Sequence, residues 1–138
     1  MPTDYAEFTK KAQTTLPATA AASDYDQTAF EAPAAGKLTG VSYTPEANIT
    51  GNNTETRTLT VVNKGSDGNG TTVMATLAYT SGVNSTDFNE DAFTLSVVAN
   101  AINFAAGDII AVVSTHGGST GLADPGGLVQ FEYKQALG

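Results

Sequence analysis

The sequence contains no cysteine, no tryptophan and only one histidine, His116. Without cysteine the chain has no disulfides, no thiolate nucleophile and none of the usual zinc ligand sets. A catalytic triad would need His116 as its base, but we interpret it as an exposed residue of a glycine-rich loop. We therefore expect no catalytic residues, no metal site and no cofactor, and the sequence does not predict an enzyme.

Basic residues are also scarce, since six Lys and Arg stand against 14 Asp and Glu, for a formal net charge of −8. Nucleic acid is therefore not an expected partner, because no basic patch is available to neutralise phosphates. No stretch approaches the roughly 20 apolar residues of a membrane span. The first residues lack the basic and apolar regions of a secretory signal, so we expect synthesis in the cytosol and no membrane partner.

What the sequence does contain is a β pattern throughout residues 25–138. Residues 107–115, GDIIAVVST, hold an apolar, β-branched run that predicts a strand buried on both faces. Residues 57–63 and 72–80 predict a hairpin, because their apolar residues alternate and the glycine-rich turn 64–70 joins them. Within the second of these strands, one inner face is expected to carry Val73, Ala75, Leu77 and Tyr79.

Further strands are predicted where apolar residues alternate between turn signals, at residues 25–32, 37–44, 93–97 and 128–134, and residues 102–104 are expected to form a short extended link. Leu38 is out of phase with Val41 and Tyr43, and a bulge at Gly40 would restore the phase. The short connections leave no room for parallel crossovers. The expected fold is all-β: an antiparallel, jelly-roll-like β-sandwich of about seven or eight strands, in one domain over residues 25–138.

Residues 1–24 differ in pattern, and we interpret them as an N-terminal arm. Asp4 can cap a helix with Glu7 as its reciprocal partner, and one helical face would then carry Tyr5, Phe8, Ala12 and Leu16. A helix of about a dozen residues is marginal on its own in water. The arm therefore packs on its own domain or becomes ordered on a partner, as a helix or as an extended segment.

A second glycine-rich loop, residues 116–127, follows the apolar strand. Glycine there permits close packing, either against the chain's own strands or against another subunit. The candidate residues for subunit contacts are His116, Gly117, Gly118 and Leu122.

Between residues 30 and 134 several turn and strand patterns occur in a fixed order. They are the entry Ala-Pro-x-x-Gly-x-Leu, an Asn-Lys-Gly turn after a threonine-rich strand, an Ala-Gly-Asp turn and a final Pro-Gly-Gly-Leu-Val strand. With these features the chain resembles the capsid decoration, or cement, proteins of tailed bacteriophages. None of the patterns is a chemical signature, so the resemblance lies in the arrangement of strands and turns.

The resemblance implies a structural protein of the virion, made in the host cytoplasm, that binds the major capsid protein on the outer capsid surface and stabilises the head. It also implies a homotrimer at or near three-fold positions and no small-molecule substrate. The N-terminal arm would then supply the capsid contacts, for which the candidates are Tyr5, Phe8, Lys10, Lys11 and Leu16.

The residues alone leave a second hypothesis open. A β-sandwich with loops rich in Asn and Thr is also typical of a carbohydrate-binding module or of a receptor-binding fibre tip. Sugars usually stack on exposed Trp or Tyr rings. The chain has no Trp, and Tyr43, Tyr79 and Tyr133 fall on strand faces that we expect to be buried.

Overall fold

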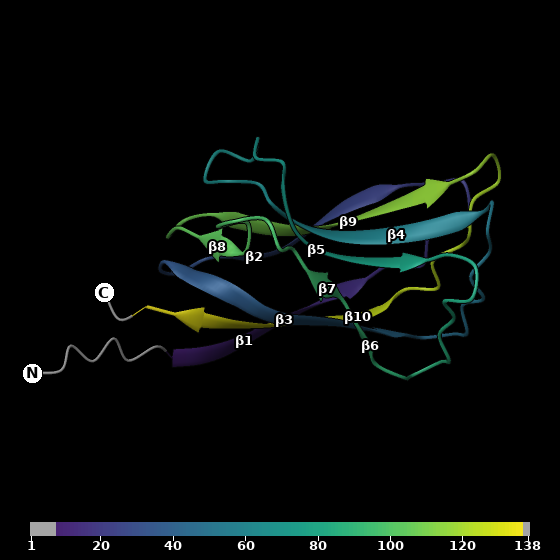
Figure 1. Ribbon diagram of the computed structural model, residues 1–138, viewed down its shortest axis with the longest axis horizontal. Coiled ribbons are helices and arrows are strands. Elements are labelled where there is room, and N and C mark those ends of the chain that lie inside the picture. The colour runs from purple at the N-terminus through teal and green to yellow at the C-terminus, as the bar shows by residue number, and fades with distance from the viewer. Residues whose placement is uncertain (1–7, 137–138) are drawn as a thin grey trace, which may run out of the picture.

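The structure, a computed structural model, describes residues 8–136 and consists there of two antiparallel β-sheets packed face to face (Figure 1). Sheet 1 has the strand order β1-β10-β3-β6, with β8 also paired to β3, and sheet 2 has the order β2-β9-β4-β5-β7. The strands are β1 (Phe8–Leu16), β2 (Tyr25–Glu31), β3 (Gly36–Pro45), β4 (Thr56–Asn63), β5 (Thr72–Tyr79), β6 (Asp91–Ala92), β7 (Thr94–Leu95), β8 (Asn103–Phe104), β9 (Ile109–Gly117) and β10 (Gly127–Gln135).

The predicted all-β sandwich is confirmed, and its described part contains no helix. It has about ten strands, of which three have only two residues, and β1 is a strand that was not predicted. The chain passes from one sheet to the other after β1, β2 and β3. This alternation is compatible with the jelly-roll-like connection, which stays a prediction. No helix that could cross a membrane occurs among residues 8–136.

β9 is the central strand that the apolar run predicted. It pairs with β2 on one side and with β4 on the other. Ile110 and Val112 are fully buried between the sheets, and Ala111 on the opposite face is only 3% exposed. β4 and β5 form the predicted hairpin. The predicted bulge is also present, because the register of β3 against β10 shifts between Gly40 and Leu38.

Two details of the predicted strands were wrong. A register shift in the hairpin turns Met74 into the core and leaves Val73 42% exposed, so Val73 does not share the inner face. Of the predicted strand 93–97 only Thr94–Leu95 (β7) is a strand, and Val97 beyond it is 98% exposed. Bulges of this kind depend on the partner strand, which alternation within one strand does not report.

Of the two forms left open for the N-terminal segment, the helix is wrong over the described part and the extended form is correct, since residues 8–16 form β1. This strand pairs with β10 along its whole length, from Phe8 opposite Gln135 to Leu16 opposite Gly127. A marginal helix loses to such pairing because the sheet satisfies the backbone and also buries Leu16 in the core, where it is 2% exposed. The boundary predicted after residue 24 therefore falls between two strands of one sandwich.

Candidate interaction surface on sheet 1

One end of sheet 1 carries a cluster of lysines. Four of the chain's six basic residues lie on its strands, and all four are exposed: Lys10, Lys11, Lys37 and Lys134. The register sets Lys37 opposite Lys134 on the neighbouring strand, and Lys11 opposite Glu132. Diagonal neighbours on adjacent strands lie about 7–8 Å apart, so Lys11, Lys37 and Lys134 share one patch on the outer face. Lys10 lies opposite the buried Tyr133 and therefore points to the other face of the sheet. We call Lys11, Lys37 and Lys134 the lysine cluster.

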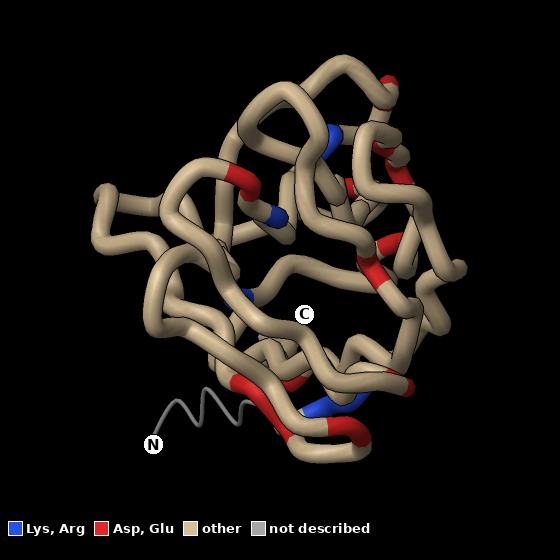
Figure 2. The backbone as a smooth tube through the Cα atoms, turned by 90° about the vertical axis from the view of Figure 1, so that its right-hand side faces the viewer, with Lys and Arg blue, Asp and Glu red and all other residues tan. Residues whose placement is uncertain are grey.

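The lysine cluster is a local exception in an acidic chain. Of the two cations outside sheet 1, Arg57 is fully buried, and Lys64 lies 3.3 Å from the carboxylate of Asp26. Acidic positions are spread over the loops at the end of the sandwich that faces the viewer in Figure 2. The cluster therefore gives sheet 1 a positive region that complements an acidic surface.

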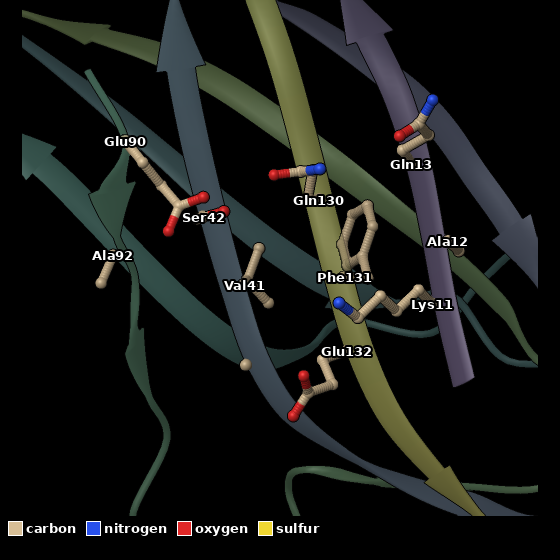
Figure 3. Close-up of a pocket in the computed structure, with 11 residues that line it drawn as sticks. Lys11, Ala12, Gln13, Val41, Ser42, Glu90, Ala92, Gln130, Phe131 and Glu132 are labelled. Atoms are coloured by element: carbon tan, nitrogen blue, oxygen red, sulfur yellow. The ribbon is translucent and has the colours of Figure 1, made fainter. Parts of the chain in front are cut away.

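Beside the lysine cluster, the outer face of sheet 1 is hollowed by a groove of about 480 Å³ (Figure 3). Its polar lining comes from β1, β3, β10 and the residue before β6: Lys11, Gln13, Ser42, Glu90, Gln130 and Glu132. Gly40 on β3 contributes to the hollow, because a Cβ atom built there would meet nothing closer than 3.9 Å. A second hollow of about 330 Å³ includes Lys37 and Lys134.

The groove is lined by groups that can form hydrogen bonds and by charged side chains. The Thr39 hydroxyl donates to the carbonyl oxygen of Glu132 at 3.1 Å and to its Oε1 at 3.3 Å, which holds that carboxylate at the edge of the groove. Phe131 lines the groove but is only 1% exposed, so it presents no ring face for stacking. Within residues 8–136, no three His, Asp or Glu side chains gather as a metal site.

The structure places the predicted capsid contacts in different environments. Lys10 and Lys11 are exposed on β1, and Lys11 also lines the groove, where it extends over β10 in Figure 3. Leu16 is part of the core, so its side chain is not available to a partner. Tyr5 lies outside the described residues, and Phe8 is described only as the first residue of β1.

At the opposite end of the sandwich, the buried Arg57 organises the loops. Its guanidinium donates to the carbonyl oxygens of Leu122 and Ser23, both at 2.8 Å, and to those of Ala20 and Ala21, both at 3.1 Å. These bonds hold the β1–β2 connection against the loop that follows β9. It also donates to the Ser114 hydroxyl at 3.2 Å and lies 4.0 Å from the carboxylate of Asp24. Because all these contacts are within the chain, we interpret Arg57 as a structural residue.

The loop after β9 is held by the chain's own side chains. Nδ1 of His116 lies 2.6 Å from Oδ1 of Asp24, and the His116 amide donates to the same oxygen at 2.8 Å. These hydrogen bonds lower the pKa of Asp24 below its ordinary value of 3.8. The carboxylate of Glu55 accepts the amides of Thr120 and Gly121.

The four residues predicted for subunit contacts all take part in this self-contained arrangement. Gly117 ends β9, and Gly118 has a positive φ of 86° and lies against Glu55. Leu122 is half-buried, and its carbonyl oxygen accepts a hydrogen bond from Arg57. His116 is hydrogen-bonded to Asp24. A contact between subunits at this loop stays a prediction.

Residues 117–121, GGSTG, match the G-x-S-x-G pattern of a nucleophile elbow, a signal that the sequence analysis did not use. The elbow needs a strand followed by a helix, but here the segment leads from β9 into an irregular loop. The Ser119 hydroxyl has Glu55 Oε1 as its partner, at 3.5 Å. Although His116 is oriented by Asp24, the hydrogen bonds do not join it to this serine, so no triad is assembled.

Asp124 is a second buried polar residue that the sequence analysis missed. It is 1% exposed and accepts hydrogen bonds from the hydroxyls of Tyr43 at 2.6 Å, Tyr25 at 3.2 Å and Ser114 at 3.2 Å. Burial, and then the charge of Asp124, raise the pKa values of Tyr43 and Tyr25 well above the ordinary 10. The carboxylate thus ties β2, β3 and β9 together across the sandwich.

Comparisons of the chain with family models, with curated proteins and with solved structures found no match. The functional argument therefore rests on the surface described above and on the patterns in the sequence.

Proposed function

We propose that the protein is a structural component of a tailed-bacteriophage virion that binds the outer surface of the capsid and stabilises the head. The observation that supports this proposal is the lysine cluster, because an acidic chain has gathered most of its exposed cations on one sheet. The resemblance over residues 30–134 supplies the partner, the major capsid protein. The role requires binding and no catalysis.

In this proposal, three copies form a homotrimer at a three-fold position, after synthesis in the host cytoplasm. Each copy adds one lysine cluster, so weak individual contacts combine by effective concentration. Binding to the assembled shell and not to its free subunits stabilises the shell by mass action. Because the contacts are ionic and lie at the surface, they weaken as salt rises.

The test is binding of the full chain to capsids that lack it, measured by co-sedimentation. Replacing Lys11, Lys37 and Lys134 together by Gln should weaken binding by roughly tenfold or more, because each is an exposed cation on the proposed contact face. The control is Lys64→Gln, which removes a half-buried cation paired with Asp26 on the other sheet and should leave binding unchanged. Equal binding by the triple variant and the wild type would contradict the lysine cluster as the contact.

A carbohydrate ligand is the second candidate, and the observation that favours it is the polar groove. The amides of Gln13 and Gln130, the hydroxyl of Ser42 and the carboxylate of Glu90 are groups that bind sugar hydroxyls. A glycan array probed with the wild type and with Gly40→Phe, which fills the groove, separates this candidate from capsid binding. Glycan binding that is lost in the Gly40 variant would support it, and an array without signal would remove it.

A further inference from the structure

The turn between β7 and β8 exposes three consecutive apolar side chains. Val97 is 98% exposed and Val98 is 69% exposed, and Ala99 after them is also exposed. The sequence has no charged residue between Asp91 and Asp108, so this segment places no carboxylate beside the valines. Single exposed apolar residues are ordinary, whereas contiguous ones mark sites of interaction. We call Val97, Val98 and Ala99 the valine tip.

Hydrogen bonds hold the valine tip in one conformation. The amide of Val98 donates to the Ser96 hydroxyl at 3.2 Å, and the Val98 carbonyl oxygen accepts the amide of Ala101 at 3.1 Å. Before the tip, the amide of Ser96 donates to the carbonyl oxygen of Met74 on β5 at 2.8 Å. A surface that is fixed in this way loses little conformational entropy when a partner covers it.

The valine tip adjoins the lysine cluster through Asn103. Lys134 on β10 lies opposite Lys37 on β3, and Lys37 lies opposite Asn103 on β8. These three side chains point outward, because a residue next to each of them is buried in the core. Asn103 is bonded to the turn of the tip, since its side-chain amide donates to Oδ1 of Asn100 at 3.2 Å and its backbone amide donates to the Asn100 carbonyl oxygen at 3.1 Å.

The cations and the apolar tip therefore belong to one surface. Neighbouring strands of a sheet are about 4.8 Å apart, so the row from Lys134 through Lys37 to Asn103 is short. In Figure 1, β8, the start of β3 and the end of β10 lie together at one end of the sandwich. A partner that contacts the lysines there also meets the valines.

We propose that the valine tip is the apolar part of the capsid contact, and that it fits an apolar pocket of the major capsid protein whose rim carries carboxylates. This inference rests on the proposed function. Charge complementarity defines the rim, because the lysines beside the tip attract acidic groups and the tip adds no charge of its own. A lipid surface would call for Trp, Phe or Leu at the tip, and the tip has none of them.

The two parts of the contact respond differently to salt. Ion pairs at a surface contribute little each and are screened as the salt concentration rises. Burial of valine side chains is not an interaction between charges, so salt does not screen it. The lysine cluster should therefore determine how steeply binding falls with salt, whereas the valine tip should supply affinity that remains at high salt.

The test measures binding of the full chain to capsids that lack it, by co-sedimentation over a series of salt concentrations. Val97→Ser combined with Val98→Ser should weaken binding roughly tenfold at every salt concentration, because apolar burial is lost. The steepness of the salt dependence should stay that of the wild type. The matched control is Val83→Ser, which removes a valine that is 41% exposed in the connection between β5 and β6 and should leave binding unchanged.

Thermal unfolding checks that each variant is folded, as we expect for exposed side chains. If the wild type binds and the double valine variant binds equally well, the valine tip is not part of the contact and the proposed function stands. If the wild type does not bind capsids, the proposed function fails and this inference fails with it. Flotation with vesicles of phosphatidylcholine and phosphatidylglycerol tests the lipid alternative. Vesicle binding that the double variant loses would overturn the capsid pocket as the partner of the tip.

Discussion

The outer faces of the two sheets differ in chemistry although both follow the same alternation along their strands. On sheet 1, outward positions of neighbouring strands hold Lys11, Lys37, Glu132 and Lys134 beside a groove. On sheet 2, the corresponding positions of β4, β5 and β9 hold only Thr, Val, Ala and Gly or Ile at the strand ends. The difference teaches that the same alternation can give one face of a sandwich charged side chains and leave the other face neutral.

The largest effect on the free energy of unfolding should come from Arg57, whose side chain is fully buried between the sheets. Arg57→Met removes the donors of four carbonyl oxygens in the loops between the sheets. Leaving such buried groups unpaired should lower the free energy of unfolding by about 3 to 5 kcal/mol. Urea denaturation measures this change.

Lys64→Met is the control for Arg57→Met, because it removes a cation at the surface and should stay within about 0.5 kcal/mol of the wild type. A loss of less than about 1 kcal/mol for Arg57→Met would show that water replaces the guanidinium. The hydrogen bonds of Arg57 would then not be needed to hold the loops together.

Salt should have a smaller effect, through the charged face of sheet 1. Raising the ionic strength from about 0.05 M to about 0.5 M shortens the range of surface charges, so capsid binding through the lysine cluster should weaken about tenfold. Co-sedimentation over the salt series provides the readout. Binding that does not change with salt would contradict the lysine cluster as the contact.

The smallest effect is the change in the free energy of unfolding at low pH. Because hydrogen bonds from His116 lower the pKa of Asp24 in the folded state, this carboxylate stabilises the fold above its unfolded pKa near 3.8. That contribution is lost as the pH falls below 3.8 through the folded-state value. The difference in unfolding free energy between wild type and Asp24→Asn should therefore be constant near neutral pH and shrink in acid. A difference that does not change with pH would show that the pair with His116 is not linked to folding.

Much of the fold follows from residues that are close in the sequence. Alternation placed β4 and the β4–β5 hairpin, and the phase of Leu38 against Val41 even required the bulge in β3. The N-terminal strand could not be predicted in this way. Tyr5, Phe8, Ala12 and Leu16 do share a helical face, but the competing interaction is with β10, more than a hundred residues away.

The polar interior was harder to predict than the strands. The same alternation that turned Leu59 and Val61 inward also turned Arg57 inward, but a charge at that phase is usually exposed. Only the loop carbonyls that the fold brings to Arg57 explain its burial. Of the candidate site, Lys11 was named from the sequence, whereas Lys37 and Lys134 became its neighbours only through the pairing of β1, β10 and β3. Lys10, also named, lies on the other face, opposite Tyr133.

The pairing of β1 with β10 has a consequence for how the protein is made. β1 is synthesised more than a hundred residues before its partner, because β10 lies between β1 and β3 in sheet 1. Until β10 has been made, β1 has no neighbour in its sheet, and the lysines of sheet 1 cannot form one surface. Sheets with such distant pairings also fold slowly, in about milliseconds to seconds. A product that stops before β10 therefore lacks the outer face of sheet 1 altogether.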